Sequence, residues 1–113
     1  MSQPRRWKVH HAQSGYIYQY VLAFAGPGLG EYRFEVAAGP GAAFPVTVVV
    51  RPEQLPAWTR EPGCALDAPY YYAIAKLSLT QAFDEHPDPG GLGPVIEPDA
   101  ESMAAILEML GAG

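Results

Sequence analysis

The chain has 113 residues and a formal net charge of −5, and 49% of its residues are hydrophobic. This length corresponds to roughly one domain of ~100–200 residues, and a chain of this size buries somewhat over ~60% of its unfolded surface, so a core needs neither a disulfide nor a metal. The one cysteine, Cys64, excludes an internal disulfide and a multi-thiolate zinc site, and it favours a reducing compartment.

Charge is distributed unevenly between the two halves of the chain. Residues 1–60 carry six Lys and Arg against three Asp and Glu, whereas residues 61–113 carry Lys76 alone against nine acidic residues. We expect no nucleic-acid partner, because phosphate binding needs clustered basic side chains and this chain is acidic as a whole. The simplest interpretation of the asymmetry is that the two halves pack on each other and attract.

The first 25 residues resemble a secretory leader in part, with Arg5, Arg6 and Lys8 ahead of an apolar stretch. That stretch holds Gln19 and three tyrosines, and its uninterrupted apolar run covers only residues 20–25 rather than the usual ~7–15 residues. No segment approaches the ~18 apolar residues that a membrane span requires. The sequence therefore predicts a cytoplasmic protein with no membrane partner.

Two strands are predicted at the start of the chain. The first is a short strand over residues 7–12, and the second runs from Gly15 to Ala25 with strict alternation. The opposite face of the second strand includes Ile17 and Val21, which are too apolar for open solvent, so we expect part of that face to be covered. The core face of the second strand is predicted to hold Tyr16, Tyr18, Tyr20, Leu22 and Phe24.

A glycine-rich loop over residues 26–30 predicts a hairpin turn into a third strand. The loop lacks the Lys-Ser/Thr pair of a phosphate loop, and a strand rather than a helix follows it. In that strand, residues 31–36, apolar side chains alternate with Glu31, Arg33 and Glu35, which predicts one buried and one wet face. A further strand is predicted over residues 44–51, where residues 46–50 are all β-branched.

The second half of the chain predicts helices. Residues 52–58 fit a short helical turn, and Asp67 fits the N-cap of a helix over residues 69–85. After a Pro/Gly-rich connector, Asp99 fits the cap of a last helix over residues 99–110, which ends at Gly111 and covers the apolar side of the first helix that faces away from the sheet.

The three consecutive tyrosines Tyr70, Tyr71 and Tyr72 cannot all face one core, because each helical step turns by 100°. At least one is expected to point elsewhere. Tyrosine suits half-buried interface positions, so these residues join Ile17 and Val21 as candidates for an interface or a pocket. The alternative is that the rings lie in the core and their hydroxyls reach water at its rim.

Two groups of residues could carry chemistry, and a structural interpretation is preferred for both. Asp84, Glu85, His86 and Asp88 could ligate a metal, but no further histidine or cysteine completes a recognisable spacing, so a solvated acidic helix end is favoured. Cys64 lacks the flanking residues of a cysteine hydrolase and is typical of a small buried hydrophobe. We therefore predict no catalytic residue, no metal and no cofactor.

Together these patterns predict one α+β domain over residues 1–113, in which an antiparallel meander of three to four strands (roughly 7–51) is followed by two helices packed on one face. The preferred hypothesis is a small non-enzymatic protein that acts through protein–protein contacts, as a homodimer or with another protein. Two alternatives stay open. One is a ligand-binding module or enzyme with a tyrosine-lined pocket between sheet and first helix that His10 or His11 reaches, and the other is an accessory subunit of a larger complex.

Overall fold

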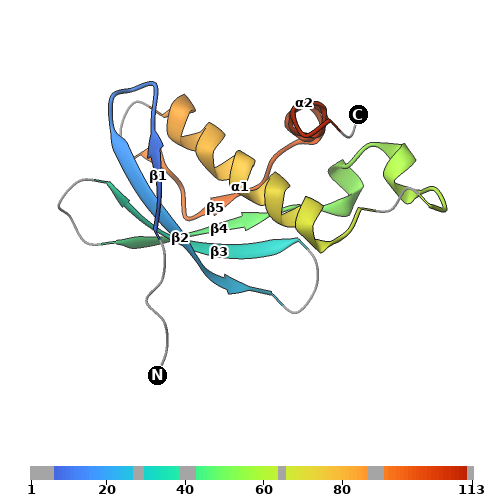
Figure 1. Cartoon of the computed structure of the whole chain (residues 1–113), viewed down its shortest axis with the longest axis horizontal. Helices are drawn as coiled ribbons and strands as arrows, with labels where there is room; N and C mark the ends of the chain where they lie inside the picture. Colours follow the sequence, from blue (N-terminus) through green and yellow to red (C-terminus); the bar gives the residue numbers. More distant parts are fainter. Residues whose placement is uncertain (1–6, 27–29, 39–42, 64–65, 87–90, 112–113) are drawn as a thin grey trace.

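A computed structural model describes residues 7–26, 30–38, 43–63, 66–86 and 91–111 of the chain. The predicted α+β class is confirmed, with a meander followed by two helices on one face (Figure 1). The elements in chain order are β1 (Lys8–His11), β2 (Ile17–Ala25), β3 (Glu31–Ala38), β4 (Phe44–Val49), the 3₁₀ turns η1 (Pro52–Gln54) and η2 (Ala57–Arg60), α1 (Ala68–Glu85), β5 (Val95–Ile96) and α2 (Ala100–Met109).

The five strands form one sheet in the order β1-β2-β3-β4-β5. The first four pair with one another antiparallel, and β5 lies parallel to β4, with Thr47 opposite Val95. Strand β5 corrects the prediction that residues 85–98 form a Pro/Gly-rich connector. It is two residues long and lies between prolines, so no alternation of side chains could reveal it.

An ion pair joins the segments that follow β4 and β5. Arg51 donates from Nη2 to Oε1 of Glu97 at 3.0 Å and from Nε to Oε2 at 3.2 Å. The Arg51 guanidinium holds the pKa of the Glu97 carboxyl below its ordinary value. Both side chains are about half exposed, so the pair contributes little to the stability of the fold.

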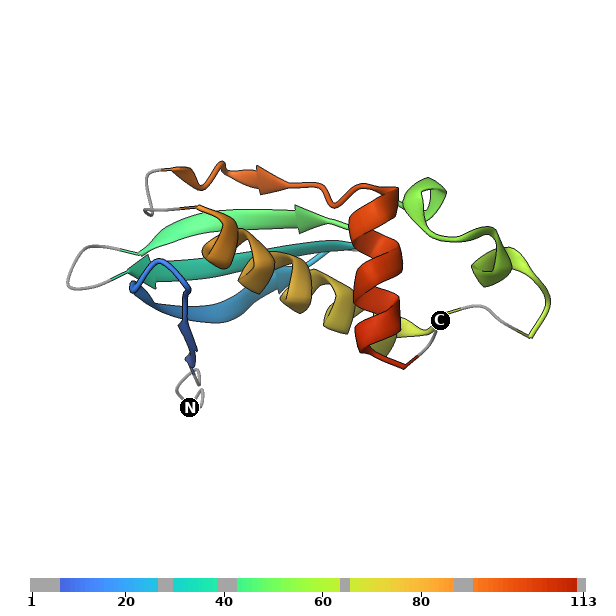
Figure 2. The ribbon, with the colours of Figure 1, turned by 90° about the horizontal axis from the view of Figure 1, so that it is seen from above.

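Both helices lie on the same side of the sheet, and α2 runs across the direction of the strands when the molecule is seen from above (Figure 2). Each helix begins at the predicted cap: the Asp67 carboxylate accepts from the N–H of Tyr70 at 3.3 Å, and the Asp99 carboxylate accepts from the N–H of Ser102 at 2.8 Å. Gly111, which follows α2, has a φ of 75°. That left-handed conformation favours glycine and ends the helix where predicted.

The core lies between the sheet and α1 and is centred on stacked aromatic rings. The rings of Tyr18 and Phe83 are parallel within 2° and their centroids lie 4.1 Å apart. Phe83 also lies 6.0 Å from the ring of Tyr20, which meets Phe34 edge-on. Helix α2 seals the far side of α1 with three buried side chains, Met103, Ile106 and Leu107.

A bulge in β2 overturns one of the predicted faces. Leu22 pairs with Phe34 and Phe24 pairs with Arg33, so Ala23 is an extra residue without its own partner. Because side chains alternate along a strand, this insertion turns Phe24 to the side of the sheet away from the helices, where it is 48% exposed. Phe24 was predicted to face the core. Tyr16, also predicted there, precedes β2 and is exposed.

Gly30 allows the backbone of β3 to begin close to the end of β4. Its φ is +110°, and an added Cβ would lie 2.5 Å from the carbonyl oxygen of Val50. The N–H of Val50 donates to the Gly30 carbonyl at 2.6 Å. Any side chain at residue 30 would therefore push the two strands apart.

Replacing Phe83 by alanine tests whether the aromatic stack holds α1 on the sheet. Phe83 is fully buried, so Phe83→Ala is expected to lower the free energy of unfolding by about 3–5 kcal/mol, measured by urea denaturation. Val95→Ala, at an exposed position on β5, is the control and should change it by less than ~0.5 kcal/mol. A loss below ~1 kcal/mol for Phe83→Ala would contradict this account.

Candidate functional site

The tyrosines of α1 divide between the core and the surface. Tyr71 is buried, and Tyr72 packs on the sheet with its ring 5.8 Å from that of Tyr32 and stacked on that of Phe34 at 6.4 Å. Tyr70 is exposed on another side of the helix. The prediction that at least one of the three points elsewhere is confirmed.

Two of the core tyrosines, Tyr20 and Tyr32, lie where burial disfavours the charged form of a phenol. Burial raises the pKa of Tyr20, and the neighbouring Tyr72 raises it further. Burial likewise raises the pKa of Tyr32, with Tyr71 adding to the effect. A raised pKa keeps both phenols protonated at neutral pH, so they can donate hydrogen bonds but are poor bases.

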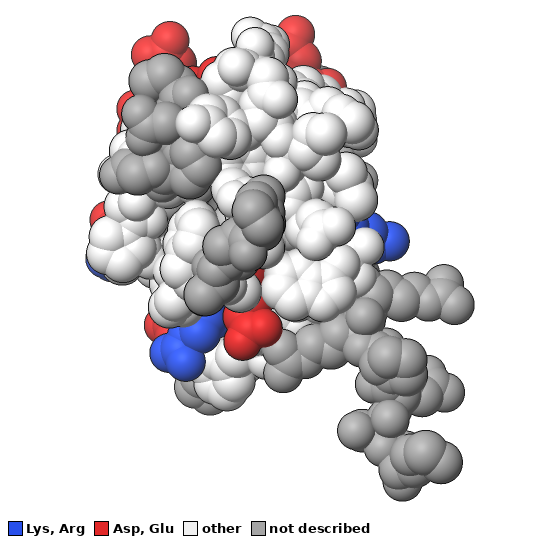
Figure 3. Space-filling model, turned by 90° about the vertical axis from the view of Figure 1, so that its left-hand side faces the viewer, with Lys and Arg blue, Asp and Glu red and all other residues white. Residues whose placement is uncertain are grey.

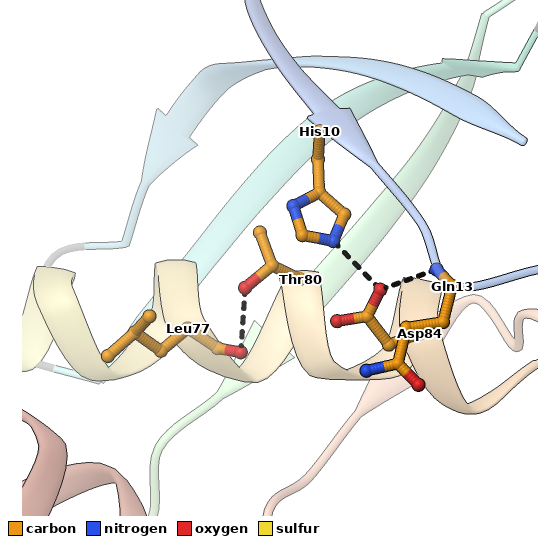
Figure 4. A network of polar contacts seen from close by, with 5 residues as sticks. All are labelled: His10, Gln13, Leu77, Thr80 and Asp84. Atoms are coloured by element: carbon orange, nitrogen blue, oxygen red, sulfur yellow. Dashed lines mark hydrogen bonds and ion pairs between the residues drawn. The ribbon is translucent and has the colours of Figure 1, made fainter. Parts of the chain in front are cut away.

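A polar cluster fastens the edge strand β1 to the end of α1 (Figure 4). One carboxylate oxygen of Asp84 lies 3.0 Å from Nε2 of His10 and accepts from the backbone N–H of Gln13 at 3.1 Å. The His10 ring also lies 5.8 Å from the ring of Phe83. His10 and Asp84 are 74 residues apart in sequence, so this contact closes the fold over a long range.

The predicted metal candidates do not come together as a metal site. Asp84 contacts His10, and Asp88 lies outside the described residues, as does Cys64. Among the residues that the structure describes, no group of three or more His, Cys, Asp and Glu could hold a metal ion. In the same described residues, no helix is long and apolar enough to cross a membrane.

An acidic cavity of about 420 Å³ lies beside the His10–Asp84 pair, between the C-terminal end of α1 and the first turn of α2. Its walls include the carboxylates of Asp84, Glu85, Asp99 and Glu101. The Asp99 carboxylate is occupied as the cap of α2, because the N–H of Ser102 donates to it and lowers its pKa below the ordinary value. No local pattern predicts this grouping, because the four carboxylates come from the end of one helix and the start of another.

The side of the sheet away from α1 and α2, here called the outer face, has no helix over it in the described part of the chain (Figure 1). Two of its apolar side chains are largely exposed, Val9 at 53% and Ile17 at 51%. Val21 also belongs to this face by register, yet it is only 8% exposed. Extending the β1–β2 register by one residue sets Trp7 opposite Val21, which explains its burial.

Charged side chains lie beside these apolar residues on β3. Arg33 sits between Glu31 and Glu35 on the outer face, with its guanidinium carbon 5.7 Å from the centre of the Phe24 ring. A cavity of about 310 Å³ opens there, with walls that include Phe24, Arg33, Glu35 and Pro45. Seen from the left-hand end of the molecule, uncharged surface dominates, and acidic and basic side chains lie next to each other near its lower edge (Figure 3).

The five candidate interface residues therefore occupy three places. Ile17 and Val21 lie on the outer face, Tyr71 and Tyr72 belong to the layer between sheet and helix, and Tyr70 lies on the helix surface. Beside Tyr70 a small apolar cavity of about 170 Å³ is lined by Pro69, Tyr70, Ala73 and Leu110. Phe24 was not predicted as a site residue, because only the bulge brings it to the outer face.

Comparison of the chain with protein-family models, curated proteins and solved structures finds no match.

Removing the Asp84 carboxylate tests whether its contacts with His10 and Gln13 hold β1 against α1. Asp84→Ala leaves the N–H of Gln13 and Nε2 of His10 without their acceptor, so the free energy of unfolding should fall by about 1–2 kcal/mol. Amide hydrogen exchange in β1 should also become faster. Glu85→Ala, at the exposed neighbouring position, is the matched control. An equal loss of stability there would show that removing any carboxylate from this end of the helix has the same effect, which would contradict a specific role for Asp84.

The cap of α2 predicts a pH dependence of stability. The folded pKa of Asp99 is below its ordinary value of 3.8, so the stability that its charge contributes is present above that value and is lost as the pH falls through the folded pKa. The melting temperature of Asp99→Ala should therefore lie below that of the parent at pH 7, with the gap closing in acid. Asp99→Asn is the control, because it keeps a cap acceptor that does not titrate. A difference in melting temperature between the parent and Asp99→Ala that does not change with pH would contradict this account.

Proposed function

We propose that this protein is a small non-enzymatic interaction protein that works as a homodimer through the outer face of its sheet. The observation that carries the proposal is the apolar surface on that face: Val9, Ile17 and Phe24 are each about half exposed, and no described helix covers them. Val9 and Ile17 are diagonal neighbours on adjacent strands, and exposed apolar side chains that share a face are typical of protein interaction sites. The neighbouring Arg33 strengthens the case, since arginine and aromatic residues are enriched at interface hot spots.

The alternative of a tyrosine-lined ligand site has less support. The rings of Tyr18, Tyr32 and Tyr72 pack against other rings. The two larger cavities described above lie between α1 and α2 and on the outer face, not between the sheet and α1. His10 approaches the core but is occupied by Asp84. An interaction protein needs none of these groups to be free.

A cytoplasmic location accompanies the proposal. The single cysteine is typical of a reducing compartment. The apolar stretch that resembles a leader is built into the centre of the fold as β2, where Tyr18 and Tyr20 are buried.

Native mass spectrometry of the purified protein tests the proposal, repeated after denaturation. The parent chain is expected to be a dimer, and Ile17→Glu is expected to weaken it by ~100-fold or more, because an unpaired carboxylate would be buried in the contact. Ile17 is the suitable position because it is exposed, whereas Val21→Glu would charge a buried side chain and threaten the fold.

Met109→Glu is the matched control, since Met109 is an apolar residue of α2 that is 64% exposed on the helix side. It should leave the dimer intact. A folded Ile17→Glu chain with the same solution mass as the parent would overturn the assignment of the outer face. A monomeric parent that carries non-protein mass, lost on denaturation, would support the ligand-binding alternative instead.

A further inference from the structure

The cavity beside Phe24 on the outer face has the size and the lining of a small-ligand site. Its volume is about 310 Å³, and small-molecule sites typically enclose ~300–1,000 Å³. Such sites are lined mostly by apolar side chains, with a few polar groups that orient the ligand. Here the charged groups of the wall are Arg33 and Glu35. The apolar part of the wall is made by Ala23, Phe24, Ala43, Phe44 and Pro45.

Arg33 is the polar group of this wall that is best placed to take a ligand. Its side chain is exposed, and it has no ion-pair partner among the residues that the structure describes. Arg51 differs, because it already donates two hydrogen bonds to Glu97. The ring of Phe24 lies 5.7 Å from the guanidinium carbon of Arg33 and covers one side of the group. A planar guanidinium can donate to both oxygens of a carboxylate at once.

Glu35, the acidic side chain of the same wall, favours a negatively charged ligand less than Arg33 does, but it is already engaged. It is partly buried and has an interaction within this chain. A cationic ligand would have to compete with that interaction, whereas a carboxylate would meet the N–H donors of Arg33, which no described acceptor uses. The charge of the cavity is therefore complementary to an anion.

We propose that this cavity binds a small organic carboxylate, whose charged group pairs with Arg33 and whose apolar body packs against Phe24 and Pro45. The site goes beyond the proposed function. It is complete within one copy of the chain, because all of its walls come from β2, β3 and the start of β4. It also lies at the opposite end of β2 from Ile17, the residue that tests the dimer.

Titration with benzoate tests the proposal, followed by the amide signals of the ¹⁵N-labelled protein at constant ionic strength. Benzoate combines a carboxylate with an apolar ring, benzylamine carries the opposite charge on the same ring, and benzamide is neutral. Benzoate is expected to shift the signals of Phe24, Arg33 and Phe44. It should bind at least ~10-fold more tightly than either of the other two compounds, because hydrogen bonds between charged groups are the stronger ones.

Two arginine variants test the assigned contact. Arg33→Gln is expected to weaken benzoate binding by ~10-fold or more, because it removes the charged fork and keeps a polar side chain. Arg51→Gln is the matched control, since it removes an exposed arginine that Glu97 already occupies. It should leave benzoate binding unchanged. The amide spectrum of each variant reports whether it is folded.

The proposal is overturned if benzoate shifts none of the cavity signals at tens of millimolar, or if benzylamine binds as tightly as benzoate. It is also overturned if folded Arg33→Gln binds benzoate as the parent does. Repeating the titration on Ile17→Glu separates this site from the proposed function, because that chain should bind benzoate like the parent. A monomeric parent that binds benzoate through Arg33 would support the site and overturn the proposed homodimer, and a dimeric parent that does not bind it would do the reverse.

Discussion

The stack of Phe83 on Tyr18 joins the last turn of α1 to strand β2, and the aromatic core is arranged around it. Once these rings are in place, Asp84 is the next residue of the helix and reaches His10 on the edge strand. Helix α2 packs on the side of α1 that faces away from the sheet. The two sides of the sheet therefore differ, since α1 and α2, the α-helices of the described residues, both lie over one face.

That division of the two faces governs what the surface can do. The helix side is closed by apolar packing and surrounded by carboxylates, two of which are already engaged, Asp84 with His10 and Asp99 with Ser102. The outer face keeps apolar side chains in contact with water. Burying such surface would stabilise the protein, and no third layer covers it in the part of the chain that the structure describes.

The fold was largely predictable because its signals are local. Asp67 and Asp99 mark the helix starts, and alternation marks the long strands. Three features were not predictable. Strand β5 is too short for a pattern, the bulge at Ala23 has no distinguishing residue type, and the His10–Asp84 contact joins distant segments. The candidate site was therefore predicted only in part, through the apolar character around Ile17.

The bulge in β2 affects both the core and the outer face. A regular β2 would place Phe24 against α1, and the outer face would then present Arg33 without an aromatic neighbour. By adding one residue, the strand moves a large ring from the core face to the outer face, where it lies against the guanidinium. The core gives up the burial of one aromatic ring in this arrangement. Bulges that redirect a side chain are common at functional edges of sheets, and this one concentrates aromatic and charged groups where an interface would use them.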